Sequence, residues 1–186
     1  MPLLDASALV PDRPCRIVVA GASGSGKTTL SARIGDAIGI EHIEIDGLHH
    51  GPNWTPRPSF VADVEDFTSQ PYWVTEWQYT VVRSLLAERA DLMIWLDLPR
   101  PVVMRQVIRR TLRRRIRREV LWNGNVEPPL YTLFTRRENI IRWSWSTHGK
   151  LVGRVGEVLE RHPDLPVVRL TSRRDIDGWT ARLGCA

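Results

Sequence analysis

The sequence predicts a single α/β domain in three layers, with helices on both faces of a parallel sheet of about five strands. Three observations lead to this prediction. Short apolar, β-branched runs alternate with segments whose apolar residues recur at helical spacing, which is typical of a parallel sheet. The run Leu92–Leu96 is apolar throughout, as in strands that are covered on both faces. A glycine-rich turn, residues 21–26, separates the first strand from the first helix.

The expected strands are short runs that lie between turn residues. They cover residues 16–20, 42–46, 72–76, 92–96 and 165–170. The expected helices repeat apolar residues every three or four positions. They cover residues 28–39, 60–69, 80–89, 130–145, 151–161 and 175–183, and another begins at Pro101. The segment 47–59 contains Pro52, Pro56 and Pro58 and is expected to be a loop.

Composition limits the kind of protein that this chain can be. Of its 186 residues, 42% are hydrophobic and 25% are charged, values typical of one globular domain. Residues 1–14 have no basic residue before Arg13, unlike a signal peptide, and we expect a loose tail before one domain over residues 15–186. Two cysteines do not make a disulfide framework or a metal site. With no apolar run long enough to span a membrane, these features predict a cytoplasmic protein that does not act at a membrane.

A phosphate-binding motif occupies residues 21–28, which read GASGSGKT and match the pattern G-x-x-x-x-G-K-[ST]. Its flanking strand and helix are the context that the motif requires. Glycines let backbone N–H groups turn towards phosphate oxygens, and the helix start adds unpaired donors. Lys27 is expected to reach the β- and γ-phosphates of ATP, and the Thr28 hydroxyl to bind Mg²⁺. The predicted nucleotide-binding residues are Gly21, Ser23, Gly24, Ser25, Gly26, Lys27, Thr28 and Thr29.

The positive charge is concentrated in one segment. The net charge is +5, yet residues 105–118 hold eight arginines and no acidic residue, so the rest of the chain is mildly acidic. The segment is expected to be a packed helix because it carries an apolar row, formed by Met104, Ile108, Leu112, Ile116 and Val120. Arginines four residues apart repel one another, which predicts an anion among them. A phosphate group is favoured, and nucleic acid is the less favoured alternative.

The chain resembles the small P-loop kinases of the adenylate kinase–shikimate kinase type. Within these, it is most similar to the adenylate-kinase-related group labelled DNA topology modulation proteins. The resemblance spans roughly residues 15–183, and it implies a P-loop NTPase fold with an arginine-rich helical lid, ATP and Mg²⁺ as cofactors, and a small-molecule acceptor. The segments that carry it are GASGSGKTTL, IDGLHHGPNW, WVTEWQY, DLMIWLDLP, the arginine-rich helix and the last strand.

The resemblance implies roles for two carboxylates. Asp46, at the end of the expected second strand, is expected to bind the acceptor hydroxyl or to orient a water of Mg²⁺. Glu76, at the end of the expected third strand, is expected to hold the Mg²⁺ shell, usually through water. Each carboxylate has a structural alternative, in which it satisfies a nearby turn or backbone group. Related proteins have Asp-Gly-Asn-Tyr where this chain has residues 76–79, EWQY, and the tryptophan that replaces glycine there is expected to alter the acceptor side.

Further candidates lie in three other places. His49 and Trp54 belong to the loop expected to cover the acceptor, although Trp54 could equally pack on the core. In the kinases that the chain resembles, a lid brings arginines onto the transferring phosphoryl group. Here the lid would span about residues 105–128, with Arg109, Arg113 and Arg117 best placed for phosphate. Arg173, after the last strand, would stack on adenine or steady a phosphate, or would be a surface arginine.

The predicted function is therefore a Mg²⁺-dependent kinase that transfers the γ-phosphoryl group of ATP to a nucleoside, a nucleotide or another small hydroxyl-bearing metabolite. Repulsion between Asp46 and a second anion mildly favours a hydroxyl acceptor over a nucleoside monophosphate. A nucleic-acid-binding NTPase and a nucleotide-binding regulator are the alternatives. The sequence does not identify the acceptor or the oligomeric state. The predicted catalytic residues are Lys27, Asp46, Glu76, Arg109, Arg113 and Arg117.

Overall fold

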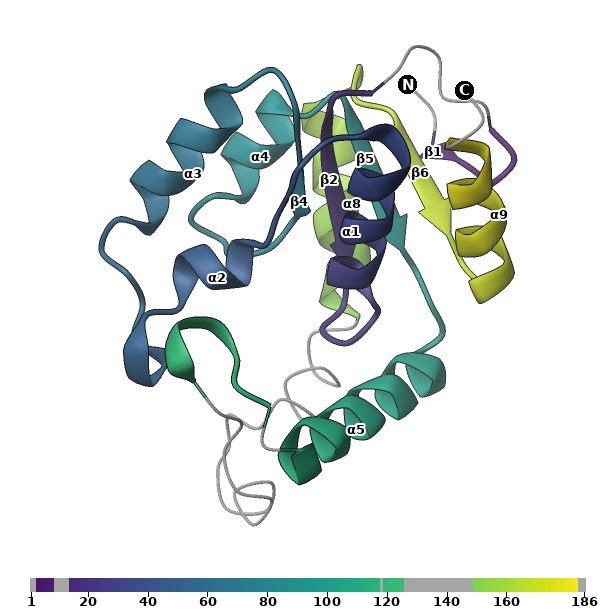
Figure 1. Ribbon diagram of the computed structural model, residues 1–186. Helices are drawn as coiled ribbons and strands as arrows, with labels where there is room; N and C mark the ends of the chain where they lie inside the picture. The colour runs from purple at the N-terminus through teal and green to yellow at the C-terminus, as the bar shows by residue number, and fades with distance from the viewer. Residues whose placement is uncertain (1–2, 9–13, 118, 126–148, 184–186) are drawn as a thin grey trace.

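The computed structural model describes residues 3–8, 14–117, 119–125 and 149–183. These residues contain a six-stranded sheet in the order β1-β6-β5-β2-β4-β3, in which all neighbouring strands are parallel (Figure 1). The predicted α/β architecture is confirmed, with one strand more than expected, because Leu3 and Leu4 of the expected tail pair with Val167 and Val168. The strands are β1 (Leu3–Leu4), β2 (Arg16–Gly21), β3 (His42–Ile43), β4 (Trp73–Glu76), β5 (Leu92–Leu96) and β6 (Val167–Leu170).

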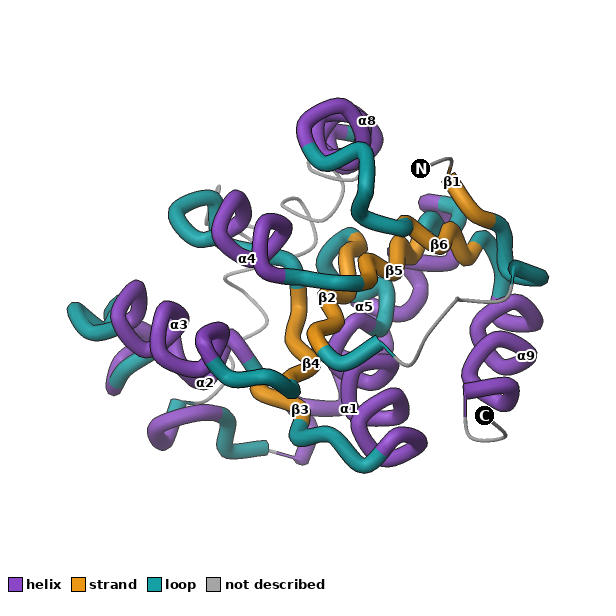
Figure 2. The backbone as a smooth tube through the Cα atoms, turned by 90° about the horizontal axis from the view of Figure 1, so that it is seen from above, coloured by secondary structure: helices purple, strands orange, loops and turns teal. Residues whose placement is uncertain are grey.

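Helices lie on both faces of the sheet, which makes three layers (Figure 2). One face carries α1 (Lys27–Ile38) and α9 (Arg173–Leu183). The other face carries α3 (Phe60–Ser69), α4 (Arg83–Arg89) and α8 (Lys150–Arg161). None of the helices in the described residues is both long enough and apolar enough to cross a membrane. The helix predicted over residues 130–145 lies outside the described residues.

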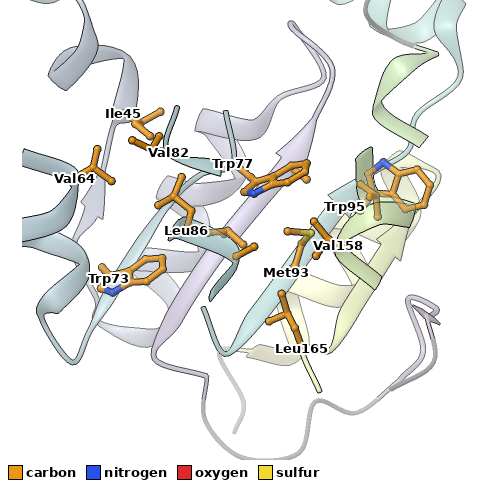
Figure 3. Packing of buried hydrophobic residues seen from close by; sticks show 14 of the residues in the cluster. Ile45, Val64, Trp73, Trp77, Val82, Leu86, Met93, Trp95, Val158 and Leu165 are labelled. Carbon is orange, nitrogen blue, oxygen red and sulfur yellow. The ribbon is translucent and has the colours of Figure 1, made fainter. Parts of the chain in front are cut away.

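Two apolar clusters fill the spaces between the sheet and its helices. Alternate residues of β2 and β5 point to opposite faces, so that Val18 and Met93 join one cluster while Val19 and Ile94 join the other. Figure 3 shows the first cluster, where side chains from α4 and α8 meet those of the sheet. Burial on both faces explains why the strands read as continuous apolar runs.

The second predicted strand is shorter than expected. β3 ends at Ile43, and the short helix α2 (Ile45–His49) begins where the strand was predicted to continue. The reason is a long-range contact, because the Ile45 N–H at the start of α2 donates to Glu76 Oε2 at 3.1 Å. Asp46 therefore lies in the first turn of a helix and not at the end of a strand. The expected loop also contains a 3₁₀ turn, η1 (Pro52–Trp54).

The arginine helix, α5 (Arg100–Arg117), packs through a different face from the one predicted. Its buried residues are Val103, Val107 and Thr111, whereas Ile116 of the predicted row is 78% exposed. Figure 1 shows the physical reason: α5 crosses beyond the carboxyl ends of the strands instead of lying along the sheet. Its packed face is therefore the one that meets the phosphate-binding loop. A 3₁₀ turn, η2 (Trp122–Gly124), follows it.

Candidate active site

The phosphate-binding loop joins β2 to α1 at the carboxyl end of β2, which lies between β4 and β5 in the sheet. Gly24 (φ 81°) and Gly26 (φ 98°) have left-handed conformations that glycine adopts without penalty. α1 begins without a side-chain cap, so its first N–H groups can bind an anion. Ser25 Oγ is buried and has no hydrogen-bond partner in the described part of the chain, which suits a loop that binds phosphate oxygens.

Lys27 is buried, and its ammonium donates to Ala22 O at 3.3 Å. Burial holds the pKa of Lys27 below its usual range, while the charges of Asp46 and Glu76 oppose that shift. Arg110 of α5 lowers the pKa of Lys27 further. The structure thus brings the predicted lysine and both predicted carboxylates into one electrostatic group.

Glu76 ends β4 as predicted and is only 1% exposed. Its Oε1 lies 3.0 Å from His42 Nε2, and it also accepts hydrogen bonds from Ile45 N–H and the Thr28 hydroxyl. Burial raises the pKa of Glu76, but the hydrogen bonds and the neighbouring His42 outweigh burial and leave this pKa below its ordinary value. Glu76 is therefore a carboxylate held in its charged form next to Thr28.

Asp46 is held by two side chains that follow β4. Tyr79 Oη donates to Asp46 Oδ1 at 2.5 Å, and Gln78 Nε2 donates to the same oxygen. Burial and the neighbouring Asp46 raise the pKa of the Tyr79 phenol, which keeps this donor protonated. Asp46 Oδ2 has no hydrogen-bond partner among the described residues. One oxygen of Asp46 is thus fixed, and the other can accept a hydrogen bond from a ligand.

Aromatic rings surround this carboxylate. His49 stacks on Tyr79 with ring centroids 3.9 Å apart, and His50 Nε2 lies 3.1 Å from Tyr79 Oη. Trp54 packs edge-on against His50, with ring centroids 5.2 Å apart. Within the described ranges, no group of three or more His, Cys, Asp or Glu side chains could hold a metal ion. The contacts of the two histidines are the hydrogen bond and ring contacts given above.

Trp77 does not face the acceptor side, contrary to the expectation from the sequence. It is buried in the cluster on the α4 face (Figure 3), where its Nε1–H donates to Arg83 O at 3.0 Å. Trp77 and its neighbours occupy alternate sides of the chain after β4, so Gln78 points to Asp46 instead. The predicted bulky change at the acceptor side is therefore wrong, and the tryptophan contributes to the core.

Among the described residues of α5, Arg110 acts on the charge of Lys27, and it is not one of the three arginines that were predicted to bind phosphate. Arg109, Arg113 and Arg117 are exposed, and the described residues give Arg113 an ion pair with Glu119 at 3.4 Å. Arg110 and Arg114 are partly buried, and Arg110 acts on Lys27. They lie three and seven residues after Val107, whose side chain would overlap a Cβ at Gly24. The packing of Val107 could not be read from the arginine pattern alone.

Two residues near the last strand also have structural partners. Arg173 forms an exposed ion pair with Asp177 at 3.3 Å, and Asp177 also pairs with Arg33 of α1 at 2.8 Å. The predicted contact of Arg173 with ATP stays a prediction. Asp97, after β5, accepts a hydrogen bond from Arg169 Nε at 2.8 Å, which gives this carboxylate a structural partner.

ATP with Mg²⁺ fits these residues. Mg²⁺ usually takes one or two protein oxygens and completes its shell with phosphates and waters, and the neighbouring Thr28 hydroxyl and Glu76 carboxylate supply such a pair. The buried hydroxyl of Ser25 and the open start of α1 fit phosphate oxygens. A second buried hydroxyl without a partner in the described residues, Thr111 Oγ1, lies one helical turn after Val107.

Comparisons with known proteins agree with the fold. No protein-family model matches the chain, and a comparison with curated proteins finds no relative of it. Shikimate kinase from Acinetobacter baumannii in complex with shikimate matches with a TM-score of 0.54 and 13% identity over 92% of each chain. A gluconokinase from Sinorhizobium meliloti 1021 matches with a TM-score of 0.49 and 23% identity, over 92% of this chain and 94% of that one. Shikimate kinase from Bacteroides thetaiotaomicron has a TM-score of 0.46 and 14% identity, over 92% and 96%.

The A. baumannii match, together with the parallel sheet and the phosphate-binding loop, shows the P-loop NTPase fold that was predicted. At 13% identity it shows the fold alone. The narrower resemblance to DNA topology modulation proteins receives no support from these comparisons and stays a prediction.

Proposed function

We propose that this protein is a Mg²⁺-dependent kinase that transfers the γ-phosphoryl group of ATP to a hydroxyl group of a small molecule. The observation that carries the proposal is the convergence of Lys27, the Thr28–Glu76 pair and Asp46 at the carboxyl ends of β2 and β4. A phosphoryl donor site and a carboxylate for an acceptor hydroxyl therefore lie next to one another. The fold shared with shikimate kinase supports the same conclusion.

Each residue has a role that follows from its position. The loop backbone and Lys27 bind and orient the phosphates, and Arg110 adds positive charge next to them. Mg²⁺, when bound, neutralises charge on the phosphate oxygens. Asp46 uses its free oxygen Oδ2 to accept the proton of the acceptor hydroxyl or to hold that hydroxyl in line. Tyr79 and Gln78 keep the carboxylate in one orientation.

The proposed acceptor is a small molecule whose hydroxyl-bearing part enters the site. That part is uncharged. The charges of Asp46 and Glu76 both raise the pKa of the nearby Glu44, so an anionic group placed among these carboxylates would be repelled. The rings of His49, His50 and Trp54 form one aromatic group with Tyr79, which bonds Asp46, and aromatic groups suit contact with a sugar or a base. A nucleoside or a sugar-like metabolite combines both features.

An acceptor screen tests this proposal. Release of ADP from ATP·Mg²⁺ is measured with a panel of nucleosides, nucleoside monophosphates, free sugars and sugar acids. We expect a member of the panel to stimulate ADP release in the wild type but not in Asp46→Asn. Asp36→Asn, which changes an exposed carboxylate on α1, is the matched control and should behave as wild type. Equal turnover in Asp46→Asn and the wild type would remove Asp46 from the proposed mechanism.

A nucleic-acid-binding NTPase is the second candidate, and one observation favours it. Arg105, Arg109, Arg113 and Arg117 recur every four residues and are exposed, so they form a basic stripe along α5 that could contact a phosphate backbone. The same ADP assay with added DNA or RNA distinguishes the two functions. Stimulation by a polyanion, with no response to any small acceptor, would favour the nucleic-acid function.

A further inference from the structure

The segment after the arginine helix is joined to the acceptor side of the site. Residues 119–125, which we call the latch, contact residues 44–54, which we call the acceptor segment. Trp122 Nε1–H donates to Glu44 Oε2 at 2.7 Å. The Asn123 side chain donates to His50 O. Trp122 also lies 3.0 Å from the position that a Cβ would take at Gly47, so the two segments are in close contact.

Asn125 makes the largest number of these contacts and is only 4% exposed. Its Oδ1 accepts the Trp54 N–H at 3.0 Å, while its Nδ2 donates to Gly51 O at 2.9 Å and to Trp122 O at 2.8 Å. A single amide side chain thus binds both ends of the η1 turn and the start of η2. Because a buried amide without partners is unfavourable, these bonds hold the two turns in a defined relation.

The η1 turn needs such support. Asn53 and Trp54 have φ values of 55° and 60°, in the left-handed region that residues with a Cβ rarely adopt. Asn123 of the latch has the same conformation, with φ 54°. Backbone conformations of this kind persist only when the surrounding structure imposes them. The hydrogen bond from Trp54 N–H to Asn125 supplies that constraint directly.

The latch is also attached to α5. The Arg114 guanidinium lies over the Trp122 ring, 5.9 Å from its centroid, and pairs with Glu119 at 3.8 Å. Two turns earlier on α5, Val107 packs on Gly24 of the phosphate-binding loop. A continuous set of contacts therefore runs from the phosphate-binding loop along α5 to the acceptor segment.

We propose that the latch couples nucleotide binding to the geometry of the acceptor segment, and that Asn125 is the positioning residue that carries the coupling. This inference rests on the proposed function, since the acceptor segment contains Asp46. A change in the position of α5 when nucleotide binds moves Trp122 and Asn125, and these move the turn that contains Trp54. The acceptor side then adopts its final geometry only when the phosphate-binding loop is filled. Such coupling would limit the transfer of the phosphoryl group to water.

Hydrogen exchange on the full chain tests the coupling without any acceptor. Amide exchange is measured with and without the ATP analogue adenosine 5′-(β,γ-imido)triphosphate and Mg²⁺. In the wild type, we expect the analogue to slow exchange in both the phosphate-binding loop and residues 50–55. In Asn125→Ala, exchange at residues 50–55 should rise by about five- to tenfold, the effect of losing one or two hydrogen bonds. That segment should no longer respond to the analogue, while the phosphate-binding loop still does.

Thr180→Val is the matched control, because Thr180 is also buried and bonds a backbone carbonyl, Ile176 O, on the distant helix α9. This variant should retain the response of residues 50–55. If Asn125→Ala does not fold, Trp122→Phe removes the bond to Glu44 and reduces the ring that packs on Arg114, and it should weaken the same response. Wild-type exchange at residues 50–55 in Asn125→Ala, or a retained response to the analogue, would overturn the proposal. Failure of the wild type to bind the analogue in calorimetry would instead reject the proposed function. In that case, the comparison of amide exchange at residues 50–55 between the wild type and Asn125→Ala, without nucleotide, would still test the role of Asn125.

Discussion

At the scale of single residues, two neighbouring carboxylates are held in different ways. Glu76 receives hydrogen bonds that favour its charged form, from His42, Ile45 N–H and Thr28. Asp46 has one oxygen bound by Tyr79 and the other without a partner in the described residues. These environments support separate roles, because a fixed charge beside Thr28 suits a metal shell while an accessible oxygen suits an acceptor hydroxyl.

Lys27→Ala should weaken the binding of ATP·Mg²⁺. A hydrogen bond to a charged group contributes about 1.5–3 kcal/mol, which corresponds to a loss of affinity of roughly ten- to 150-fold. Isothermal titration calorimetry on the folded variant measures this loss. Arg33→Ala, which removes a cation of the same helix that pairs with Asp177 of α9, is the control and should bind as wild type. Undiminished affinity in Lys27→Ala would contradict the role of Lys27.

Glu44 should make stability depend on pH. Burial raises the pKa of Glu44 above its ordinary value of 4.5, helped by Glu76 and Asp46 and opposed by the bond from Trp122. The folded state then binds the proton more tightly than the unfolded state does, so stability falls as pH rises above about 4.5. Glu44→Gln keeps an oxygen for Trp122 and removes the charge.

Urea unfolding of the wild type and Glu44→Gln between about pH 4 and pH 8 measures this effect. The free energy of unfolding of the wild type, relative to the variant, should decrease as pH rises through that range. Glu41→Gln changes an exposed carboxylate three residues earlier and should follow the wild type. A constant difference between wild type and Glu44→Gln would show that Glu44 titrates alike in both states.

At the scale of secondary-structure elements, α5 packs directly on the phosphate-binding loop. Its packed face is Val103, Val107 and Thr111, and Val107 fills the space above Gly24. The helix therefore acts on the phosphate-binding loop by direct packing as well as by charge. This arrangement also fixes which arginines can approach a bound phosphate.

Gly24→Ala should destabilise the fold and weaken ATP binding. A Cβ at this position would overlap Val107 and would sit at a φ of 81°, and a left-handed conformation costs about 1–2 kcal/mol for a residue with a Cβ. Val107→Ala makes room for the added methyl group. The double variant should therefore be less destabilised in urea unfolding than the sum of the two single variants. Strict additivity would mean that α5 does not pack on Gly24.

Arg110→Ala should lower ATP·Mg²⁺ affinity by about tenfold or more, as expected for one charge-assisted contact next to Lys27. Arg109→Ala is the matched control, since Arg109 is exposed and an exposed charge contributes little. Calorimetry compares the two. If Arg109→Ala binds ATP·Mg²⁺ more weakly than Arg110→Ala, the sequence-based prediction that Arg109 contacts phosphate would be favoured. Such a result would require a different position of α5 when nucleotide is bound.

At the scale of the whole molecule, the arrangement of strands brings the two halves of the site together. β2 and β4 are neighbours in the sheet although Gly21 and Glu76 are far apart in sequence. Parallel strands end at the same edge of a sheet, so the phosphate-binding loop, Glu76 and the acceptor segment meet there. α5 covers that edge (Figure 1), and several of its arginines are exposed.

The distribution of charge gives a prediction for the whole molecule. Binding of a labelled oligonucleotide to the exposed stripe should be weak and should fall steeply with salt, because phosphate contacts release counterions. ATP turnover with a small acceptor should be unchanged by the oligonucleotide. Fluorescence anisotropy and the ADP assay at several salt concentrations measure both quantities. Tight binding with oligonucleotide-stimulated hydrolysis would favour the nucleic-acid function.

The sequence could predict those parts of the site that are local in the chain. The phosphate-binding loop, its Lys27 and its Thr28 depend on a short motif between one strand and one helix. Glu76 was also predictable, because the residue that ends a buried strand lies at the functional edge of a parallel sheet. Its partner His42 was not, since the pairing of β3 with β4 decides that contact. Gln78 and Tyr79 were missed for the same reason.

The alternation of strands and helices, the nucleotide loop and the concentration of arginine can be predicted from the chain alone, because each is a pattern of neighbouring residues. Long-range contacts determine which face of α5 is packed, that Trp77 belongs to the core, and that Asn125 joins the two sides of the site. A helix with apolar residues on two faces can pack through either one, and the choice depends on the surface that it meets. That surface is Gly24, more than eighty residues earlier in the chain than Val107.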